Sequence, residues 1–257
     1  RVLDDTRVSL QFETTIESLP AADLVVGADG ARSKVRELVG IQTNQWPYEQ
    51  TAVVTHLETE FGHKQTAWQR FLREGPLGML PLADGRISVV WSTTDEIARQ
   101  ALQASDEQLG AMLTNASDGV LGKLTVVGPK GAFPLCAQHA ENYILPGVAL
   151  IGDAAHAIHP LAGQGANLGL QDAAELARVI DAAIDEGLYP GDRPVLRRYE
   201  RARKGTNSTM LHFMTGLNRL FTTDSKLVGE IRTIGMRLFN NSGPIKERAV
   251  KVALGVK

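Results

Sequence analysis

The first part of the chain contains two kinds of apolar pattern. Residues 8–14 alternate with a period of two, which predicts a strand and leads us to expect that the chain starts inside a folded unit. A continuous apolar run over 23–27 then leads into Ala28-Asp29-Gly30, and a helix-like stretch follows over 33–39. This order predicts a strand, a turn and a short helix.

Short alternating segments separated by turn residues occupy residues 51–135. Asp84-Gly85 lies between two of these segments and is typical of a tight hairpin turn. The pattern predicts an antiparallel sheet, because each segment presents one apolar face and the connections are short. Within the same region we expect one or two helices over 95–113 and a further strand over 124–127.

The second half of the chain is dominated by helical periodicity. An apolar strand over 148–151 runs into Gly152-Asp153, and a long helix is expected from about Gly165. Asp172 is left outside the apolar pattern of this helix. The residues expected on its core face recur at spacings of three and four: Leu168, Ala173, Leu176, Ala177, Ile180, Ala183 and Ile184.

Beyond Pro194 the pattern is helical throughout, first over 195–204 and then along a second apolar stripe. This stripe is either part of the core or a surface that meets a partner or a membrane. Its members are Met210, Phe213, Met214, Leu217, Leu220 and Phe221.

Charge is distributed unevenly along the chain. The net charge is −2, yet residues 193–257 hold 14 Lys or Arg against 4 Asp or Glu, which gives this segment +10 and leaves residues 1–192 at −12. With 43% hydrophobic residues and little net charge, we expect a globular protein that does not bind nucleic acid. The basic segment fits solvated helix faces, and it also fits peripheral contact with an anionic membrane.

A single cysteine, Cys136, excludes an internal disulfide and favours a reducing compartment such as the cytoplasm. We expect Cys136 to pack rather than to act as a nucleophile. No apolar run approaches the ~18 residues of a membrane-spanning helix, and the first residues do not resemble a signal peptide. The expected location is therefore the cytoplasm, with peripheral membrane contact as the alternative.

The segment over 150–173 carries the strongest chemical signal. Asp153 directly follows a buried strand, where a carboxylate can accept hydrogen bonds from the hydroxyls of a sugar or ribityl chain. Gly163 and Gly165 lie where the long helix starts, so that a flat ligand can approach the backbone amides. A reduced flavin needs such a place, because it carries negative charge that helix N-terminal amides stabilise.

This segment resembles the second FAD-binding motif of the FAD-dependent aromatic hydroxylases, the class A flavoprotein monooxygenases. The resemblance implies that the acidic residue contacts the ribityl chain, that the proline lies beside the flavin ring, and that the glycine-led helix faces the pyrimidine end of the ring. The residues that match these positions are Gly152, Asp153, Pro160, Gly163, Gln164, Gly165, Ala166 and Asn167.

The segment over 23–36 resembles the Asp-Gly motif of the same family. Alone, it could be an ordinary strand-turn-helix with a solvated turn. Paired with the first motif, it implies a contact near the FAD pyrophosphate and a link to nicotinamide use, with Asp29, Gly30 and Arg36 as the candidates. Further similarity over 131–135, 199–204 and 253–256 extends the resemblance over nearly the whole chain. Within the family, residues 156–165 and the tail are most similar to the hydroxylases of ubiquinone biosynthesis.

The resemblance implies a mixed α/β (α+β) fold of the aromatic-hydroxylase type. Residues 1–45 and 136–192 would form the FAD-binding domain, residues 46–135 an inserted substrate domain with an antiparallel sheet, and residues 193–257 a basic helical region. The chain has no Gly-x-Gly-x-x-Gly after a strand, so the N-terminal βαβ unit that binds the ADP half of FAD in this family is absent from it.

The family chemistry implies an NAD(P)H- and FAD-dependent monooxygenase that hydroxylates an aromatic ring with O₂ through a flavin C4a-hydroperoxide. No side chain is expected to be a catalytic nucleophile. The substrate would be a polyprenyl-phenol or quinol intermediate of ubiquinone biosynthesis, which partitions into lipid. Phe71, Met79 and Trp91 are the candidate lining residues, and each could equally be an ordinary strand core residue.

Three other functions are compatible with parts of the sequence to different degrees. Asp153, His156 and His159 could ligate zinc or iron, but their spacing differs from His-Glu-x-x-His and no second carboxylate follows nearby, so we expect no metal. A serine hydrolase would need a Gly-x-Ser-x-Gly turn, which the chain lacks. A catalytically incomplete chain could instead act as a structural or assembly subunit of a ubiquinone-synthesis complex, without binding FAD.

Overall fold

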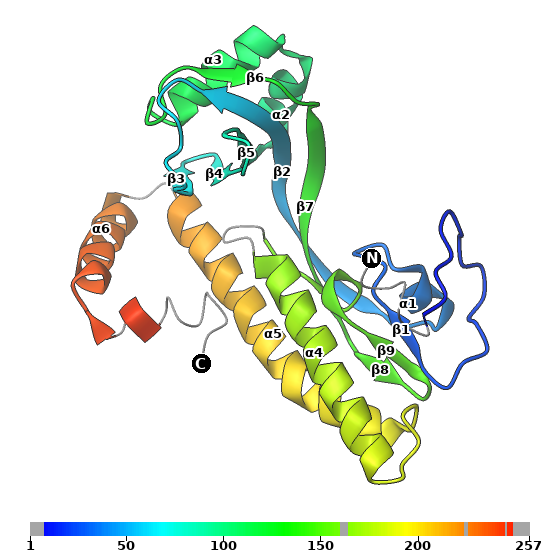
Figure 1. Ribbon diagram of the computed structural model, residues 1–257. Coiled ribbons are helices and arrows are strands. Elements are labelled where there is room, and N and C mark those ends of the chain that lie inside the picture. Colours follow the sequence, from blue (N-terminus) through cyan, green and yellow to red (C-terminus); the bar gives the residue numbers. More distant parts are fainter. Residues whose placement is uncertain (1–7, 160–163, 224–225, 245, 249–257) are drawn as a thin grey trace.

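A computed structural model describes residues 8–159, 164–223, 226–244 and 246–248, and long strands connect its two parts (Figure 1). One part contains a small sheet and the helix pair α4 (Gln164–Asp185) and α5 (Arg193–Thr222), which pack side by side. The other part is a larger sheet covered on one face by α2 (Asp95–Gln103) and α3 (Asp106–Ala116). The mixed α/β fold with an antiparallel sheet and a helical C-terminal region is confirmed.

The small sheet brings together two segments that are more than 100 residues apart in sequence. Its order is β1 (Val25–Gly27), β9 (Val148–Leu150) and β8 (Ile144–Leu145). β1 and β9 are parallel, with Gly27 opposite Leu150, so their carboxyl ends lie at the same edge. The helix α1 (Lys34–Leu38) follows β1, and η1, a 3-10 turn (Gly152–Ala154), follows β9.

The larger sheet is antiparallel, as predicted, and its two longest strands extend beyond the expected limits. Its order is β10-β7-β2-β5-β4-β3, with β6 paired to the far end of β2. The strands are β2 (Thr43–Thr59), β3 (Trp68–Leu72), β4 (Gly75–Pro81), β5 (Ile87–Thr94), β6 (Leu124–Val126), β7 (Gly131–Ala140) and β10 (His156–Ala157). The domain boundaries at 45/46 and 135/136 fall within β2 and β7, and they stay a prediction.

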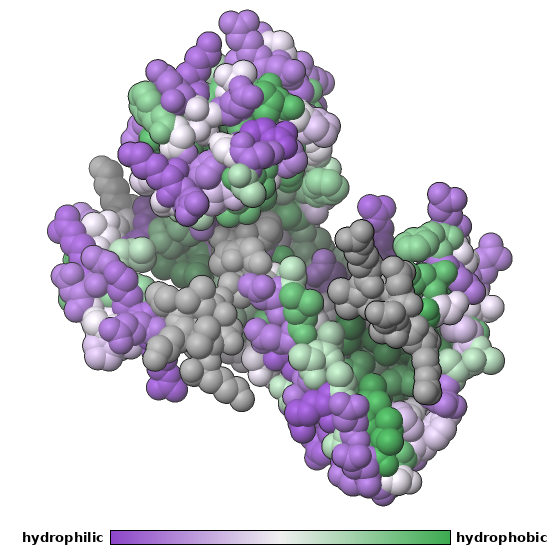
Figure 2. All heavy atoms as spheres, in the orientation of Figure 1, coloured by the Kyte–Doolittle hydropathy of each residue, from purple (hydrophilic) through white to green (hydrophobic). Residues whose placement is uncertain are grey.

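Two separate hydrophobic clusters form the core. The first joins the small sheet to α4 and α5 through large buried side chains such as Tyr143, Leu150 and Tyr199. The second lies between the larger sheet and α2 and α3, and includes Leu57 and Leu113. The outer surface of the α2–α3 part is mostly hydrophilic, whereas hydrophobic residues are visible in the recess between that part and the α4–α5 pair (Figure 2).

Helices α2 and α3 begin at residues whose side chains cap them. The Thr94 hydroxyl accepts from the Ile97 amide at the start of α2, and Ser105 and Gln108 form a reciprocal capping box at the start of α3. The C-terminal helix α6 (Lys226–Asn240) follows α5. Within the described residues, no helix is long and apolar enough to cross a membrane.

Two sequence predictions about packing are wrong. Residues 8–14 are exposed and form no strand, because they find no neighbouring strand in the described chain. On α4, Ala177 and Ile184 are exposed, whereas Asp172 is completely buried. The buried face of α4 therefore comprises Leu168, Asp172, Leu176, Val179 and Ala183.

The expected stripe on α5 divides between core and surface. Met214 is buried against the rest of the protein, whereas the Phe213 side chain is exposed. Phe221 stacks on Phe71 of β3, with ring centroids 4.0 Å apart, and so links the end of α5 to the larger sheet. Cys136 is exposed on β7, so the expectation that it packs in the interior is also wrong.

Candidate cofactor site

The two predicted motifs lie next to each other at the carboxyl edge of the small sheet. The Ile151 amide donates to the Gly27 carbonyl over 3.0 Å, so the turns after β9 and β1 start from adjacent positions. Gly152 and Gly30 have φ values of +57° and +82°, a region that favours glycine. Ligands of open α/β sheets bind at the carboxyl ends of such strands.

Arg36 connects the two turns. Its guanidinium donates over 2.8 Å to the carbonyl of Ala154 in η1, and over 2.8 Å to the carbonyl of Ala31 in the other motif. The side chain is 9% exposed, so these bonds are sheltered from water. Arg36 thus holds the Asp-Gly turn against the Gly-Asp turn. Its predicted contact with the cofactor stays a prediction.

Asp29 shapes the first turn by capping α1. Its carboxylate accepts hydrogen bonds from the Ser33 hydroxyl over 2.5 Å and from the Lys34 and Val35 amides over 2.7 and 3.1 Å. Partial burial raises the pKa of Asp29, but the hydrogen bonds from Ser33 and the two amides outweigh it, and the pKa lies below its ordinary value. Asp29 is therefore ionised at neutral pH, and its carboxylate accepts hydrogen bonds from residues of its own motif.

Asp153 differs from Asp29 because its side chain is exposed. It lies beside the first turn of α4: a Cβ placed on Gly165 would be 3.9 Å from Asp153 Oδ1. Ala166 and Asn167 are also exposed in this turn. An exposed carboxylate therefore faces a helix N-terminus whose amides carry partial positive charge.

A buried carboxylate that is not among the predicted site residues lies directly behind this site. Asp172 Oδ2 accepts from the Gly152 amide over 3.1 Å and lies 2.5 Å from His156 Nε2. Asp172 Oδ1 accepts from Arg203 Nε over 2.7 Å and from Asn207 Nδ2 over 3.0 Å. Burial alone would raise the pKa of Asp172, but hydrogen bonds from His156, Arg203 and Asn207 keep it below its ordinary value.

One signal in the sequence could have identified Asp172. It is spaced four residues from both Leu168 and Leu176, so a regular helix places it on the same face as these two residues. A carboxylate on a buried helix face needs a cation and hydrogen-bond donors. The partners Arg203 and Asn207 are also four residues apart.

The residues proposed as an alternative metal site do not converge. His156 Nε2 bonds to Asp172, His159 Nε2 bonds to Gln50 Oε1 over 3.0 Å, and the Asp153 carboxylate is exposed. Among the described residues, no group of three or more His, Cys, Asp or Glu side chains could hold a metal ion. Burial lowers the pKa of His159 to about 4, so its ring is neutral at pH 7.

Some predicted residues fall outside this description. Pro160 and Gly163 lie outside the described residues, and Gln164 is described only as the first residue of α4.

Among the predicted substrate residues, Phe71 is 37% exposed, whereas Met79 and Trp91 are 1% and 6% exposed in the cluster beneath α2 and α3. Their burial favours ordinary core packing for these last two.

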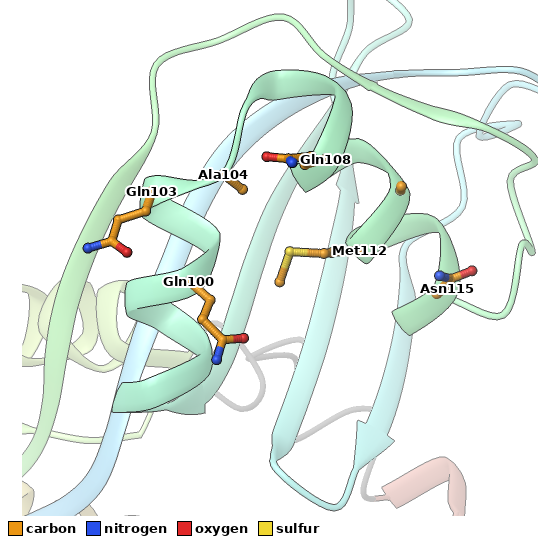
Figure 3. A pocket seen from close by; sticks show the side chains of 7 residues that line it. Gln100, Gln103, Ala104, Gln108, Met112 and Asn115 are labelled. Carbon is orange, nitrogen blue, oxygen red and sulfur yellow. The ribbon is translucent and has the colours of Figure 1, made fainter.

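A separate open groove lies between α2 and α3 (Figure 3). Its lining is mostly amide side chains together with one thioether: Gln100, Gln103, Ala104, Gln108, Ala111, Met112 and Asn115. No acid or base lines this groove, and none of the predicted cofactor residues belongs to it. It therefore offers no group for acid-base chemistry or for binding a charged cofactor.

The residues at the edge of the small sheet fit the flavin end of FAD. Asp153 can accept hydrogen bonds from ribityl hydroxyls, and the first turn of α4 can donate amides to the pyrimidine end of the ring. Gly165 leaves open the space beside Asp153 that a side chain would otherwise occupy. The chemistry of this donor set agrees with the predicted site, whose individual contacts stay predictions.

Comparison with known proteins identifies several relatives by sequence. The chain is 38% identical over 255 residues to the ubiquinone hydroxylase UbiL of Rhodospirillum rubrum, covering 99% of this chain and 58% of the relative. It is 38% identical to the 3-demethoxyubiquinol 3-hydroxylase of Escherichia coli, covering 91% of this chain and 60% of the relative. The chain thus spans about three fifths of the length of these relatives.

Solved structures agree with the sequence comparison. The complex of Pseudomonas aeruginosa PqsL with 2-aminobenzoylacetate is similar with a TM-score of 0.65 and 25% identity, covering 80% of this chain and 58% of that chain. The p-nitrophenol 4-monooxygenase PnpA of Pseudomonas putida shares the fold, with a TM-score of 0.67, 20% identity, and coverage of 90% and 58%. The family described as FAD binding domain matches residues 7–213. Because this match extends over most of the chain, the chain belongs to the FAD binding domain family.

Proposed function

We propose that the complete protein is an FAD-dependent monooxygenase that hydroxylates an aromatic ring. The observation that carries this proposal is the meeting of the two motifs at one sheet edge, where the exposed Asp153 faces the first turn of α4. When bound and reduced, FAD would supply the two electrons that activate O₂, so that one oxygen atom of O₂ is transferred to the ring and the other leaves as water. NAD(P)H is the proposed reductant.

The side chains of this site bind and orient rather than react. Asp153 accepts hydrogen bonds from the ribityl hydroxyls, and the amides at Gly165 to Asn167 stabilise negative charge on the reduced ring. Arg36 keeps the two turns together through its bonds to Ala154 and Ala31. Pro160, Gly163 and Gln164 complete the proposed contact surface, and Asp29 and Gly30 form the turn near the pyrophosphate.

The proposed substrate is a polyprenyl-phenol or quinol intermediate of ubiquinone biosynthesis. The names of the two relatives with 38% identity support this substrate class, since both describe hydroxylation of ubiquinone or a ubiquinol precursor. Hydroxylation by an electrophilic oxygen also requires an electron-rich ring. Phe71, which is partly exposed and stacked on Phe221, is the strongest candidate of the three lining residues.

A lipid-soluble substrate also suggests where the protein works. We propose a cytoplasmic protein with peripheral membrane contact through the C-terminal helices. On α6 the apolar side chains of Ile234, Met236 and Leu238 are exposed close to Arg232 and Arg237. Exposed apolar residues next to basic ones are typical of helices that lie on anionic bilayers.

The test uses the protein from the complete reading frame that contains this chain. Purified protein is mixed with FAD, NADH or NADPH, and a short-chain polyprenyl phenol or quinol in detergent, and products are analysed by mass spectrometry. We expect a product heavier by one oxygen, labelled from ¹⁸O₂ and not from water. A protein that binds FAD but never hydroxylates such a ring would contradict the proposed substrate class.

The alternative function is that of a structural or assembly subunit of a ubiquinone-synthesis complex. It predicts a stable complex with other proteins of that pathway and no flavin on the purified protein, even after reconstitution. Flavin content therefore separates the two functions before any substrate is tested.

A further inference from the structure

A run of polar residues on α5 contacts the strand and turn that carry the Gly-Asp motif. The Tyr199 hydroxyl donates over 2.7 Å to the carbonyl of Leu150, the last residue of β9. The Glu200 carboxylate accepts a hydrogen bond over 2.9 Å from the amide of Tyr143. Tyr143 lies immediately before β8, the strand that precedes β9. Four residues after Tyr199 on the same helix, Arg203 donates to Asp172. This face of α5 therefore holds β9 and its turn from behind.

Asp172 is the acceptor on which these contacts converge. Its two oxygens receive donors from η1, β10 and α5, while Asp172 itself belongs to α4. The Arg203 guanidinium also donates to the Leu168 carbonyl and to Asn207 Oδ1, so its own orientation is fixed. Four elements that are separate in sequence are thus joined through one carboxylate that is fully buried.

The bond from the Gly152 amide to Asp172 sets the position of the next residue, Asp153. Gly152 has positive φ, and α4 crosses so close that a Cβ on Gly169 would lie 3.2 Å from Gly152 Cα. The turn is therefore confined by packing on one side and by a hydrogen bond on the other. A shift of the Gly152 amide would carry the Asp153 carboxylate away from the first turn of α4.

We propose that Asp172, held by Arg203 and Asn207, is a positioning residue for the flavin site: it fixes the Gly152 amide and thereby the Asp153 carboxylate. This proposal rests on the proposed function. Asp172 touches neither cofactor nor substrate and acts only through the turn. The segment Tyr199–Asn207 thereby has a function in cofactor binding although it lies on a helix behind the site.

The first test is a double-mutant cycle on the complete protein, with the dissociation constant of FAD measured by fluorescence titration of the apoprotein. Asp172→Asn keeps the shape of the side chain but replaces one acceptor oxygen by a donor facing other donors. We expect FAD to bind on the order of tenfold more weakly. In an Asp153→Ala background, Asp172→Asn should weaken binding little further, because its effect acts through Asp153.

Asp181→Asn is the matched control, since it makes the same acid-to-amide change at an exposed position of the same helix. It should leave the FAD dissociation constant unchanged. Equal weakening by Asp172→Asn in the wild-type and Asp153→Ala backgrounds would overturn the positioning role, because a general loss of folding acts independently of Asp153. FAD binding by the wild-type protein together with no effect of Asp172→Asn would also overturn it, while leaving the proposed function intact.

A second measurement does not depend on FAD. Hydrogen exchange of the apoprotein, followed by mass spectrometry, should show faster exchange in Asp172→Asn for peptides that contain Gly152, with unchanged exchange for peptides from β4 and β5. Unchanged exchange at Gly152 would overturn the positioning role. A wild-type protein that binds no FAD would overturn the proposed function, and the positioning of a flavin site with it.

Discussion

Gly165 shows how a single residue can matter through the side chain that it lacks. In the structure the Cβ of an added side chain would point toward Asp153 Oδ1 at 3.9 Å, an ordinary contact distance. The backbone of α4 can therefore accept a larger residue at this position without moving. A ligand that lies between Asp153 and the helix would clash with the added side chain.

The predicted effect of Gly165→Ala is weaker FAD binding without loss of stability. Alanine favours a helix over glycine by up to about 1 kcal/mol, so the free energy of unfolding in urea should be unchanged or higher. The FAD dissociation constant should rise. Gly169→Ala is the control for packing: its Cβ would lie 3.2 Å from Gly152 Cα, and we expect it to destabilise the fold. Wild-type FAD affinity in Gly165→Ala would contradict the proposed location of the ring.

His159 predicts a pH dependence of stability. Burial lowers its pKa from 6.5 to about 4, so between these values the unfolded chain binds a proton that the folded protein excludes. The contribution of His159 to the free energy of unfolding should therefore be fully present above pH 6.5. It should fall as the pH drops toward 4, by about 1.4 kcal/mol per pH unit.

The measurement is urea unfolding at several pH values between 4 and 7.5, for the wild type and for His159→Gln. The variant should lose less stability per pH unit than the wild type. His212→Gln, at an exposed position on α5, serves as the control and should retain the wild-type slope. Equal slopes for the wild type and His159→Gln would show that His159 is not held neutral by burial.

At the scale of secondary structure, local pattern was sufficient where elements depend on their own residues. The strand at 25–27, the helix that follows it and most strands of the larger sheet were predicted from periodicity and turn residues, whereas β10 was not. Residues 8–14 have the same alternation, yet they form no strand. Alternating apolar residues give a segment one face that can be buried. The segment becomes part of a sheet only where a neighbouring strand pairs with it.

The buried polar residues could not be placed by the same pattern. Asp172 interrupts an apolar helix face, and a sequence does not say whether such a residue is exposed or paired. Its partners Arg203 and Asn207 lie on another helix, so the pairing depends on how α4 and α5 pack. Likewise, Met79 and Trp91 were correctly read as strand residues, but which face they occupy depends on where α2 and α3 lie.

At the scale of the whole molecule, the two motifs form one site because β1 and β9 pair in parallel across more than 100 residues of sequence. Strands β2 to β7 of the larger sheet lie between them along the chain, and the chain enters and leaves this part through β2 and β7 (Figure 1). The family match covers both motifs and the inserted sheet together. We propose that the chain contributes the flavin end of the site; the two relatives named above are longer than this chain.

We propose above all that this chain holds a flavin through Asp153. The most direct test is the visible absorption spectrum of the complete protein and its Asp153→Ala variant, after reconstitution with FAD and gel filtration. We predict the two bands of an oxidised flavin on the wild type and their loss, or a large decrease, on the variant. Equal flavin content in both proteins would contradict the role of Asp153. No flavin on the wild type would contradict the proposed FAD-dependent function.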